Sequence, residues 1–131
     1  MNVFYNTIVF VKDIAKSKEF YRDVIGIKIE TEYETIIFFE NHFTIHDAKN
    51  LLQTIFGDKP KDNTLQGRRN IDIYFESDDI QESYRKVKES GTEIIHGIKE
   101  QAWGQNVFRF FDPDGHIVEI GEAMHLDYLK K

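Results

Sequence analysis

One order of predicted elements occurs twice along this chain, and that repeat constrains the fold more than any other feature. Thr7–Val11 and Ile71–Phe75 are rich in β-branched and aromatic residues, which is typical of strands. Each predicted strand is followed by a stretch in which apolar residues recur at helical spacing, first over residues 14–25 and then over residues 80–90. A strand followed by a helix is therefore predicted at the start of each half.

The ends of the two predicted helices also correspond. Asp13 can cap the first helix, and Asp79 has capping-box spacing to Glu82 at the start of the second. Gly26 and Gly91 stand where a left-handed residue would end each helix. Asp13 is as far from Gly26 as Asp78 is from Gly91, so an internal duplication is the simplest interpretation.

Three further strands are predicted after each helix. They are Ile27–Glu32, Thr35–Phe39 and Phe43–His46 in the first half, and Glu93–Ile98, Val107–Phe111 and Ile117–Ile120 in the second. Asp112-Pro113-Asp114-Gly115 predicts a tight turn before the last strand. The prediction is an α+β fold of two βαβββ modules in a single domain over residues 1–131. Module 1 covers about 1–47, a linker about 48–70 with a short helix near Leu51–Phe56, module 2 about 71–123, and a tail 124–131.

Composition excludes several classes of function. The chain has no cysteine, which rules out disulfides, thiol nucleophiles and cysteine-based zinc sites. The formal net charge of −6 disfavours nucleic acid as a partner. No apolar run approaches the roughly 18 residues that a membrane span needs, and no signal peptide is visible. We therefore expect a soluble cytoplasmic protein without a membrane or nucleic-acid partner.

Two stretches carry a resemblance to a known superfamily. The first is Val11-Lys12-Asp13 followed by Phe20–Gly26, and the second is Trp103-Gly104 followed by Phe110–Glu119. They resemble the vicinal oxygen chelate superfamily, which includes glyoxalase I, bleomycin and fosfomycin resistance proteins, and extradiol dioxygenases. The resemblance implies a mixed sheet of two βαβββ modules curled around a cavity. It also implies homodimers, and, in the metal enzymes, metal ligands from the first and last strand of each module.

The implied metal positions fall on a set that departs from the superfamily pattern. The opening positions of the two modules are Asn6 and Asp72, where histidine is usual. The last-strand positions are His46, chosen by strand parity over Asp47, and Glu119, which matches the pattern. His46, Asp72 and Glu119 could hold a divalent cation such as Mn, Fe or Zn, with Asn6 as a weak fourth ligand. Without histidine at either opening position, glyoxalase I activity is not expected.

The alternative is that no metal binds. Two carboxylates facing a partly dry cavity, Asp72 and Glu119, then need other partners, because burial opposes their ionisation. Arg109, His46, water or a cationic ligand could supply them. A wet strand face shared by Asp72, Tyr74 and Glu76 would also explain the first carboxylate.

Candidate ligand-binding residues complete the predicted site. Trp103 lies in a loop that the resemblance places at the cavity edge, where its indole could stack on a planar ligand. Arg109 could orient an anionic group or pair with Glu119. The remaining candidates are Asn6 and three aromatic residues that would form either cavity wall or core: Phe10, Phe39 and Tyr74.

Two functions remain open. The first is a metal-independent protein that binds, and so sequesters, a planar or cationic small molecule in a cavity of aromatic and carboxylate side chains. The second is a metal-dependent lyase, isomerase, transferase or dioxygenase that uses the His46, Asp72 and Glu119 set. A regulatory domain with a vestigial pocket is a third and less specific alternative. The sequence alone identifies no catalytic residue.

Overall fold

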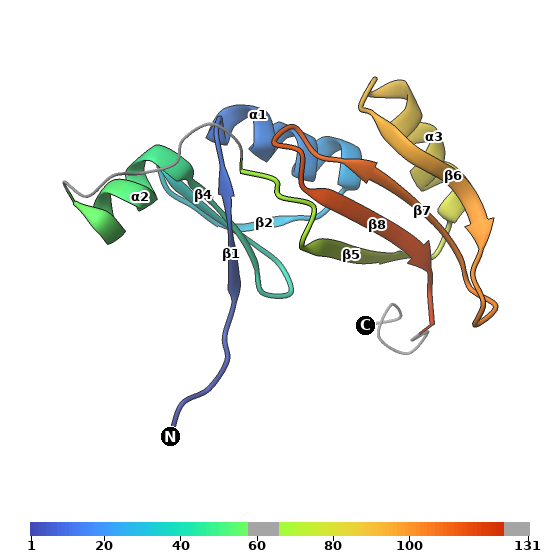
Figure 1. Ribbon diagram of the computed structural model, residues 1–131, viewed down its shortest axis with the longest axis horizontal. Coiled ribbons are helices and arrows are strands. Elements are labelled where there is room, and N and C mark those ends of the chain that lie inside the picture. The colour runs from blue at the N-terminus through green and yellow to red at the C-terminus, as the bar shows by residue number, and fades with distance from the viewer. Residues whose placement is uncertain (58–65, 125–131) are drawn as a thin grey trace. The chain divides into compact units, whose positions relative to one another are not determined.

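The structure is a computed structural model that describes residues 1–57 and 66–124. It divides into two compact units, unit 1 over Met1–Gln66 and unit 2 over Gly67–Lys131, which are described separately. Figure 1 shows the strands and helices of both. The predicted linker residues 58–65 and tail residues 125–131 lie outside the described part of the chain. No helix among the described residues is long and apolar enough to cross a bilayer.

Unit 1 follows the predicted order, including the short helix expected after its last strand. Its elements are β1 (Thr7–Val11), α1 (Ile14–Glu19), η1 (Phe20–Ile25), β2 (Ile29–Glu32), β3 (Ile36–Phe39), β4 (Phe43–Asp47) and α2 (Ala48–Phe56). The sheet order is β1-β4-β3-β2, with β1 and β4 parallel and the other pairs antiparallel. Helix α2 falls inside the segment predicted as linker and contains the short helix expected there.

Local signals position the first helix as predicted. The side chain of Asp13 accepts a hydrogen bond from the backbone N–H of Lys16, which satisfies one free donor of the first turn. Gly26 ends the helix with φ 89° in the left-handed region. The predicted single helix is wrong in one respect, because its second half, η1, is wound more widely as a π-helix.

The core of unit 1 lies on one face of its sheet. Val9, Val11 and Ile45 are buried there, at alternate positions of β1 and at the centre of β4. Tyr21 of η1 is fully buried and packs against Phe43 with a ring-centroid distance of 4.9 Å. The opposite face of this sheet therefore carries Ile8, Phe10, Thr44 and His46.

Unit 2 repeats the arrangement. Its elements are β5 (Asp72–Ser77), α3 (Ile80–Glu89), β6 (Ile94–Glu100), β7 (Asn106–Phe111) and β8 (Ile117–Glu122). The sheet order is β5-β8-β7-β6, again with one parallel pair, β5 with β8. The side chain of Asp79 caps α3 by accepting from the backbone N–H of Glu82, as the capping-box spacing predicts. The N-cap of α3 is thus Asp79. In the comparison of the two halves, Asp13 therefore corresponds to Asp79 and not to Asp78.

The buried face of sheet β5-β8-β7-β6 packs on α3. Phe108 and Phe110 of β7 are fully buried and stacked with their centroids 5.5 Å apart, and Tyr84 of α3 meets Phe108 edge-on. Arg109 and Phe111 are on the other face of β7, as predicted from alternation.

The turn before β8 also forms as predicted. The backbone N–H of Gly115 donates to the carbonyl of Asp112, and the Asp112 carboxylate accepts from the backbone N–H groups of Asp114 and His116. His116 is buried, whereas a residue just after a turn would be expected to face solvent. The hydrogen bond to the buried Asp112 draws the backbone of His116 inward. Both four-stranded sheets are open and mixed, so the predicted α+β fold of two βαβββ modules is confirmed.

Candidate functional site

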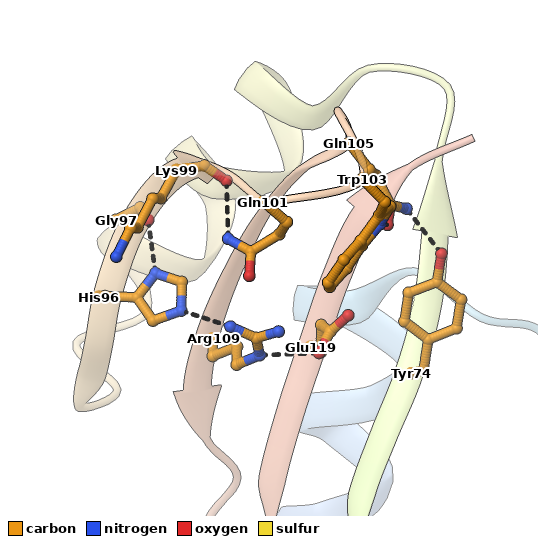
Figure 2. Close-up of polar contacts among 9 residues, drawn as sticks. All are labelled: Tyr74, His96, Gly97, Lys99, Gln101, Trp103, Gln105, Arg109 and Glu119. Atoms are coloured by element: carbon orange, nitrogen blue, oxygen red, sulfur yellow. Dashed lines mark hydrogen bonds and ion pairs between the residues drawn. The ribbon is translucent and has the colours of Figure 1, made fainter. Parts of the chain in front are cut away.

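A row of polar side chains crosses the sheet of unit 2 from edge to edge. Tyr74 of β5 pairs in register with Glu119 of β8, Glu119 pairs with Arg109 of β7, and Arg109 pairs with His96 of β6. Directly paired residues in a sheet project from the same face, so these four side chains line up side by side. Figure 2 shows the contacts that join three of them. We call Tyr74, Glu119, Arg109 and His96 the polar row.

The centre of the polar row is an ion pair shielded from solvent. Arg109 Nε donates to Glu119 Oε1 at 2.7 Å, and the side chain of Glu119 is only 9% exposed. Arg109 Nη1 lies 3.0 Å from His96 Nε2. A guanidinium only donates, so His96 Nε2 accepts and Nδ1 carries the proton, which it donates to the carbonyl of Gly97 at 2.8 Å. Arg109 is therefore held on both sides.

Asp72 adds a second carboxyl group beside Glu119. It is the second residue before Tyr74 on β5 and lies on the same face of the strand. Partial burial, a hydrogen bond with Glu119 and the negative charge of Glu119 raise the pKa of Asp72 to about 7, while Arg109 acts in the opposite direction. The guanidinium of Arg109 bonds to Glu119, so the pair of carboxyls has one cation for two potential negative charges.

Two exposed aromatic side chains, Tyr74 of the polar row and Trp103 beside it, are hydrogen-bonded to one buried amide, that of Gln105. Tyr74 donates from its hydroxyl to Glu76 at 2.6 Å and is 45% exposed. Gln105 Nε2 donates to that hydroxyl and to the carbonyl of Glu122, each at 2.8 Å. Gln105 Oε1 accepts from the indole N–H of Trp103 at 2.7 Å. Figure 2 shows the hydrogen bond between Gln105 and Tyr74, with Trp103 next to Gln105.

Unit 1 places different residues at the corresponding positions. Asn6 precedes the helix cap Asp13 by as many residues as Asp72 precedes its cap Asp79. Thr44 pairs with Ile8 in β1, as Glu119 pairs with Tyr74 in β5. The strand register therefore gives Thr44 the position in unit 1 that Glu119 has in unit 2.

Among the described residues of unit 1, three side-chain polar atoms are buried without a hydrogen-bond partner: Asn6 Oδ1, Thr44 Oγ1 and His46 Nδ1. The other ring nitrogen of His46, Nε2, lies 3.0 Å from the amide oxygen of Asn50, which only accepts, so Nε2 carries the proton. The unpartnered Nδ1 of His46 thus presents a lone pair. Asp47, excluded by parity from the predicted metal set, instead caps α2 by accepting from the backbone N–H of Asn50.

A pocket of about 250 Å³ lies at one end of the sheet of unit 1. Its lining combines aromatic rings with one carboxylate: Tyr5, Asn6, Glu30, Phe38, Phe39, Asn41 and His42. Glu30 sits at a bulge in the pairing of β2 with β3, and bulges redirect side chains. Of the predicted wall residues, Phe39 borders this pocket but is 2% exposed and packs on Tyr21 and Phe43, so it also serves as core. Phe10 is half-buried and pairs with His46 across β1 and β4.

The donor set for a metal is incomplete within each unit. Asp72 and Glu119 would supply two carboxylate ligands, which suit a divalent cation, although one oxygen of Glu119 is engaged by Arg109. His46 belongs to unit 1 and they belong to unit 2. In the described part of the chain, no three His, Asp or Glu side chains gather closely enough to hold a metal ion.

Sequence reasoning found most of this constellation but missed two members. Asp72, Tyr74, Trp103, Arg109 and Glu119 were predicted, and unit 2 brings them to one region of its polar face. The missed members are His96, which holds Arg109, and Gln105, which holds Trp103 and Tyr74. In the sequence, the one feature that could have pointed to Gln105 is that this polar residue stands two positions after Trp103.

The duplicated topology defines the class of protein as the vicinal oxygen chelate superfamily, in agreement with the sequence-based prediction. The chain belongs to the family described as glyoxalase-like domain, whose model matches residues 4–125.

Three similar proteins illustrate the range of relatives. The chain is 28% identical over 113 residues to the metallothiol transferase FosB of Staphylococcus haemolyticus, covering 84% of this chain and 76% of that one. It is 42% identical to a protein of unknown function from Agrobacterium tumefaciens whose crystal structure matches with a TM-score of 0.87, covering 95% of this chain and 96% of that one. A lactoylglutathione lyase from Agrobacterium tumefaciens has the same fold, with a TM-score of 0.70 at 19% identity over 94% of this chain and 95% of that one.

Proposed function

We propose that this protein binds a small organic cation on the polar face of unit 2, with Asp72 and Glu119 as the groups that recognise its charge. The observation that carries the proposal is that this cluster has more carboxyl groups than cationic side chains. Two carboxyl groups lie together, and the nearby guanidinium of Arg109 bonds to Glu119. The raised pKa of Asp72, about 7, expresses the cost of placing a second negative charge there.

A ligand carrying one positive charge would remove that cost. An ammonium, amidinium or guanidinium group donates hydrogen bonds, and both carboxylates accept them. Charge-assisted hydrogen bonds of this kind are among the stronger polar contacts in proteins. The net charge of −6 also attracts cations to the surface. Asp72 would act as the direct partner of the ligand, and Glu119 as the second acceptor fixed in place by Arg109.

The exposed aromatic side chains favour a ligand with a flat apolar part. Tyr74 is 45% exposed and Trp103 is 59% exposed, both within unit 2. Rings of this kind bind planar groups by stacking and attract cations through their π-faces. The proposed ligand class is therefore a planar cation that the protein sequesters without chemical change.

A fluorescence titration tests the proposal. Trp103 is the single tryptophan, so its emission reports on this site alone. The probes are benzamidine, a planar cation, and benzamide, its neutral counterpart of similar shape. We expect benzamidine to bind at least about tenfold more tightly, which corresponds to roughly 1.4 kcal/mol. Asp72→Asn should remove this preference, whereas Asp78→Asn, an exposed residue outside the row, should preserve it. Equal binding of the two probes by the wild-type protein would overturn the proposal.

A metal-dependent enzyme is the second candidate function, because the similar proteins include metallothiol transferases. In that case Asp72 and Glu119 would be two of the ligands, and the metal would supply Lewis-acid stabilisation of negative charge on a substrate oxygen. The chain's own contribution would be to fix Glu119 through Arg109 and to present Tyr74 and Trp103 to the substrate.

Elemental analysis of the untreated protein separates the two candidates. A tightly held transition metal at one per chain, lost in Glu119→Ala and in Asp72→Asn, would establish the metal-dependent candidate and contradict the first proposal. Metal-free protein that binds benzamidine in preference to benzamide supports the first proposal. Arg109→Lys provides the control, because it keeps the positive charge beside Glu119 and removes no carboxylate.

A further inference from the structure

The loop between β6 and β7 holds an exposed tryptophan in a fixed orientation. Trp103 is 59% exposed, yet its indole N–H donates to Gln105 Oε1 at 2.7 Å. An exposed indole bonded to water alone would be free to change rotamer. Gln105 itself is 4% exposed, so the acceptor belongs to the rigid part of the unit. The loop therefore presents a large apolar ring to solvent while limiting its motion.

Gln105 is in turn fixed from three directions. Its Nε2 group donates to the Tyr74 hydroxyl and to the backbone carbonyl of Glu122, each at 2.8 Å, so both amide protons are used. Its Oε1 accepts from Trp103. These contacts join the loop to β5 and to the end of β8, at positions far apart in the sequence. Every hydrogen-bonding group of the amide is thereby engaged, which leaves one stable orientation.

The sheet makes room for this amide at Gly121. A Cβ atom placed on Gly121 would collide with Gln105 Nε2 and would lie 3.2 Å from a ring carbon of Tyr74. The absence of a side chain at this point of β8 therefore lets Gln105 and Tyr74 lie close over the strand. In Figure 2 the amide of Gln105, which also bonds to Trp103, is joined by a hydrogen bond to Tyr74.

We infer that Gln105 makes the site selective for flat aromatic cations over aliphatic ones, by holding the indole of Trp103 ready for stacking. This inference depends on the proposed binding of cations at Asp72 and Glu119. It adds that a different residue, Gln105, determines which cations bind most tightly. A ring whose orientation is fixed loses little conformational entropy when a flat ligand stacks on it. Gln105 is a positioning residue, since it acts on the ligand through Trp103 and Tyr74.

Two amidinium probes of equal charge test the inference. Benzamidine carries an aromatic ring, and acetamidine carries a methyl group in its place. The wild-type protein should bind benzamidine about tenfold more tightly than acetamidine, since an aromatic contact is worth about that factor. Gln105→Ala should bind acetamidine as the wild type does and lose the preference for benzamidine. Fluorescence anisotropy of Trp103 should fall in the same variant, because the indole is released.

Gln101→Ala is the matched control. Gln101 lies in the same loop, and its side chain donates to the carbonyl of Lys99. This variant should retain both the preference and the anisotropy. If Gln105→Ala leaves both quantities unchanged, the positioning role is wrong. If the wild type binds both amidinium probes equally and Asp72→Asn weakens both, the selectivity is wrong while the cation site stands. If the wild type binds neither probe, the cation site and the selectivity fail together.

Discussion

Units 1 and 2 share one strand order but place opposite chemistry at corresponding positions. Unit 2 has Asp72 and Glu119, two ionisable groups that share a hydrogen bond, and Glu119 is also paired with Arg109. Unit 1 has Asn6 and Thr44, two neutral groups whose side-chain oxygens are buried without a partner. The fold therefore tolerates either a connected network of charges or isolated polar atoms at the same place in the sheet.

The difference teaches which parts of each unit are structural and which are available for binding. The buried faces are alike, since both pack alternate apolar residues of the parallel strand pair against a helix. The polar faces differ because nothing in the fold itself dictates their residues. His46 in unit 1 occupies the place that Gly121 has in unit 2, so only unit 2 has room there for an amide such as Gln105.

The largest effect is expected from breaking the ion pair of unit 2. Glu119→Gln leaves Arg109 without its 2.7 Å charged partner, while Asp72 is too exposed to replace it fully. Removing one member of a largely buried pair costs several kcal/mol, and we expect a loss of about 3 kcal/mol in the free energy of unfolding. Urea denaturation of the variant measures it. The double variant Arg109→Met with Glu119→Leu should lose less than Glu119→Gln, and a larger loss in the double variant would contradict the ion-pair account.

A smaller loss is expected from filling the space at Gly121. In Gly121→Ala the new methyl group would displace Gln105 and press on Tyr74, and overpacking of this kind costs about 1–3 kcal/mol. The emission of Trp103 should shift as its hydrogen bond to Gln105 is lost. Gly97→Ala is the control, because its Cβ would lie 3.2 Å from the Tyr84 hydroxyl, at the end of a side chain that can move. A shift in Trp103 emission of equal size in both variants would count against the role of Gly121.

The sequence predicted the buried half of each unit well. Strand alternation, the caps at Asp13 and Asp79 and the stop at Gly26 are local signals, and each formed as expected. The two open mixed sheets followed from repetition of these signals. The local signals predicted neither the π-helical winding of η1 nor the burial of His116.

The polar face was harder to predict because it depends on register between strands. His96 aligns with Arg109 through two irregularities in the pairing of β6 with β7, which simple alternation does not reveal. Gln105 bonds to Tyr74, 31 residues away in sequence. In unit 1, strand parity favoured His46 over Asp47 as the last-strand position, whereas the parallel register gives Thr44 the place that corresponds to Glu119. The assignment of His46 as a metal ligand stays a prediction.

A pH-dependent effect of moderate size is expected at Asp72. Its pKa is about 7 in the folded protein and about 4 in an unfolded chain, so the folded state binds more protons between these values. The contribution of Asp72 to stability is therefore present below pH 4, falls as the pH rises towards 7, and is constant above that. The variant Asp72→Asn lacks this loss, so it should become more stable than the wild type as the pH rises. Because Asp72 is exposed and its charge is screened by solvent, we expect the difference in the free energy of unfolding to reach only about 1 kcal/mol. Thermal denaturation of both proteins from pH 4 to 8 measures the difference, and parallel curves would contradict it.

The smallest effect, and one of opposite sign to that of Glu119→Gln, is expected at the corresponding position of unit 1. Thr44→Val replaces a fully buried hydroxyl that has no hydrogen-bond partner by a methyl group of similar size. Because an unsatisfied buried hydroxyl opposes folding, the variant should be more stable by about 0.5–1 kcal/mol. Thr31→Val on the exposed strand β2 controls for β-propensity and should change stability less. If Thr44→Val instead lowers the free energy of unfolding by more than about 1 kcal/mol, the Thr44 hydroxyl has a hydrogen-bond partner in the folded protein. The two units would then differ in charge but not in how completely their buried polar groups are hydrogen-bonded.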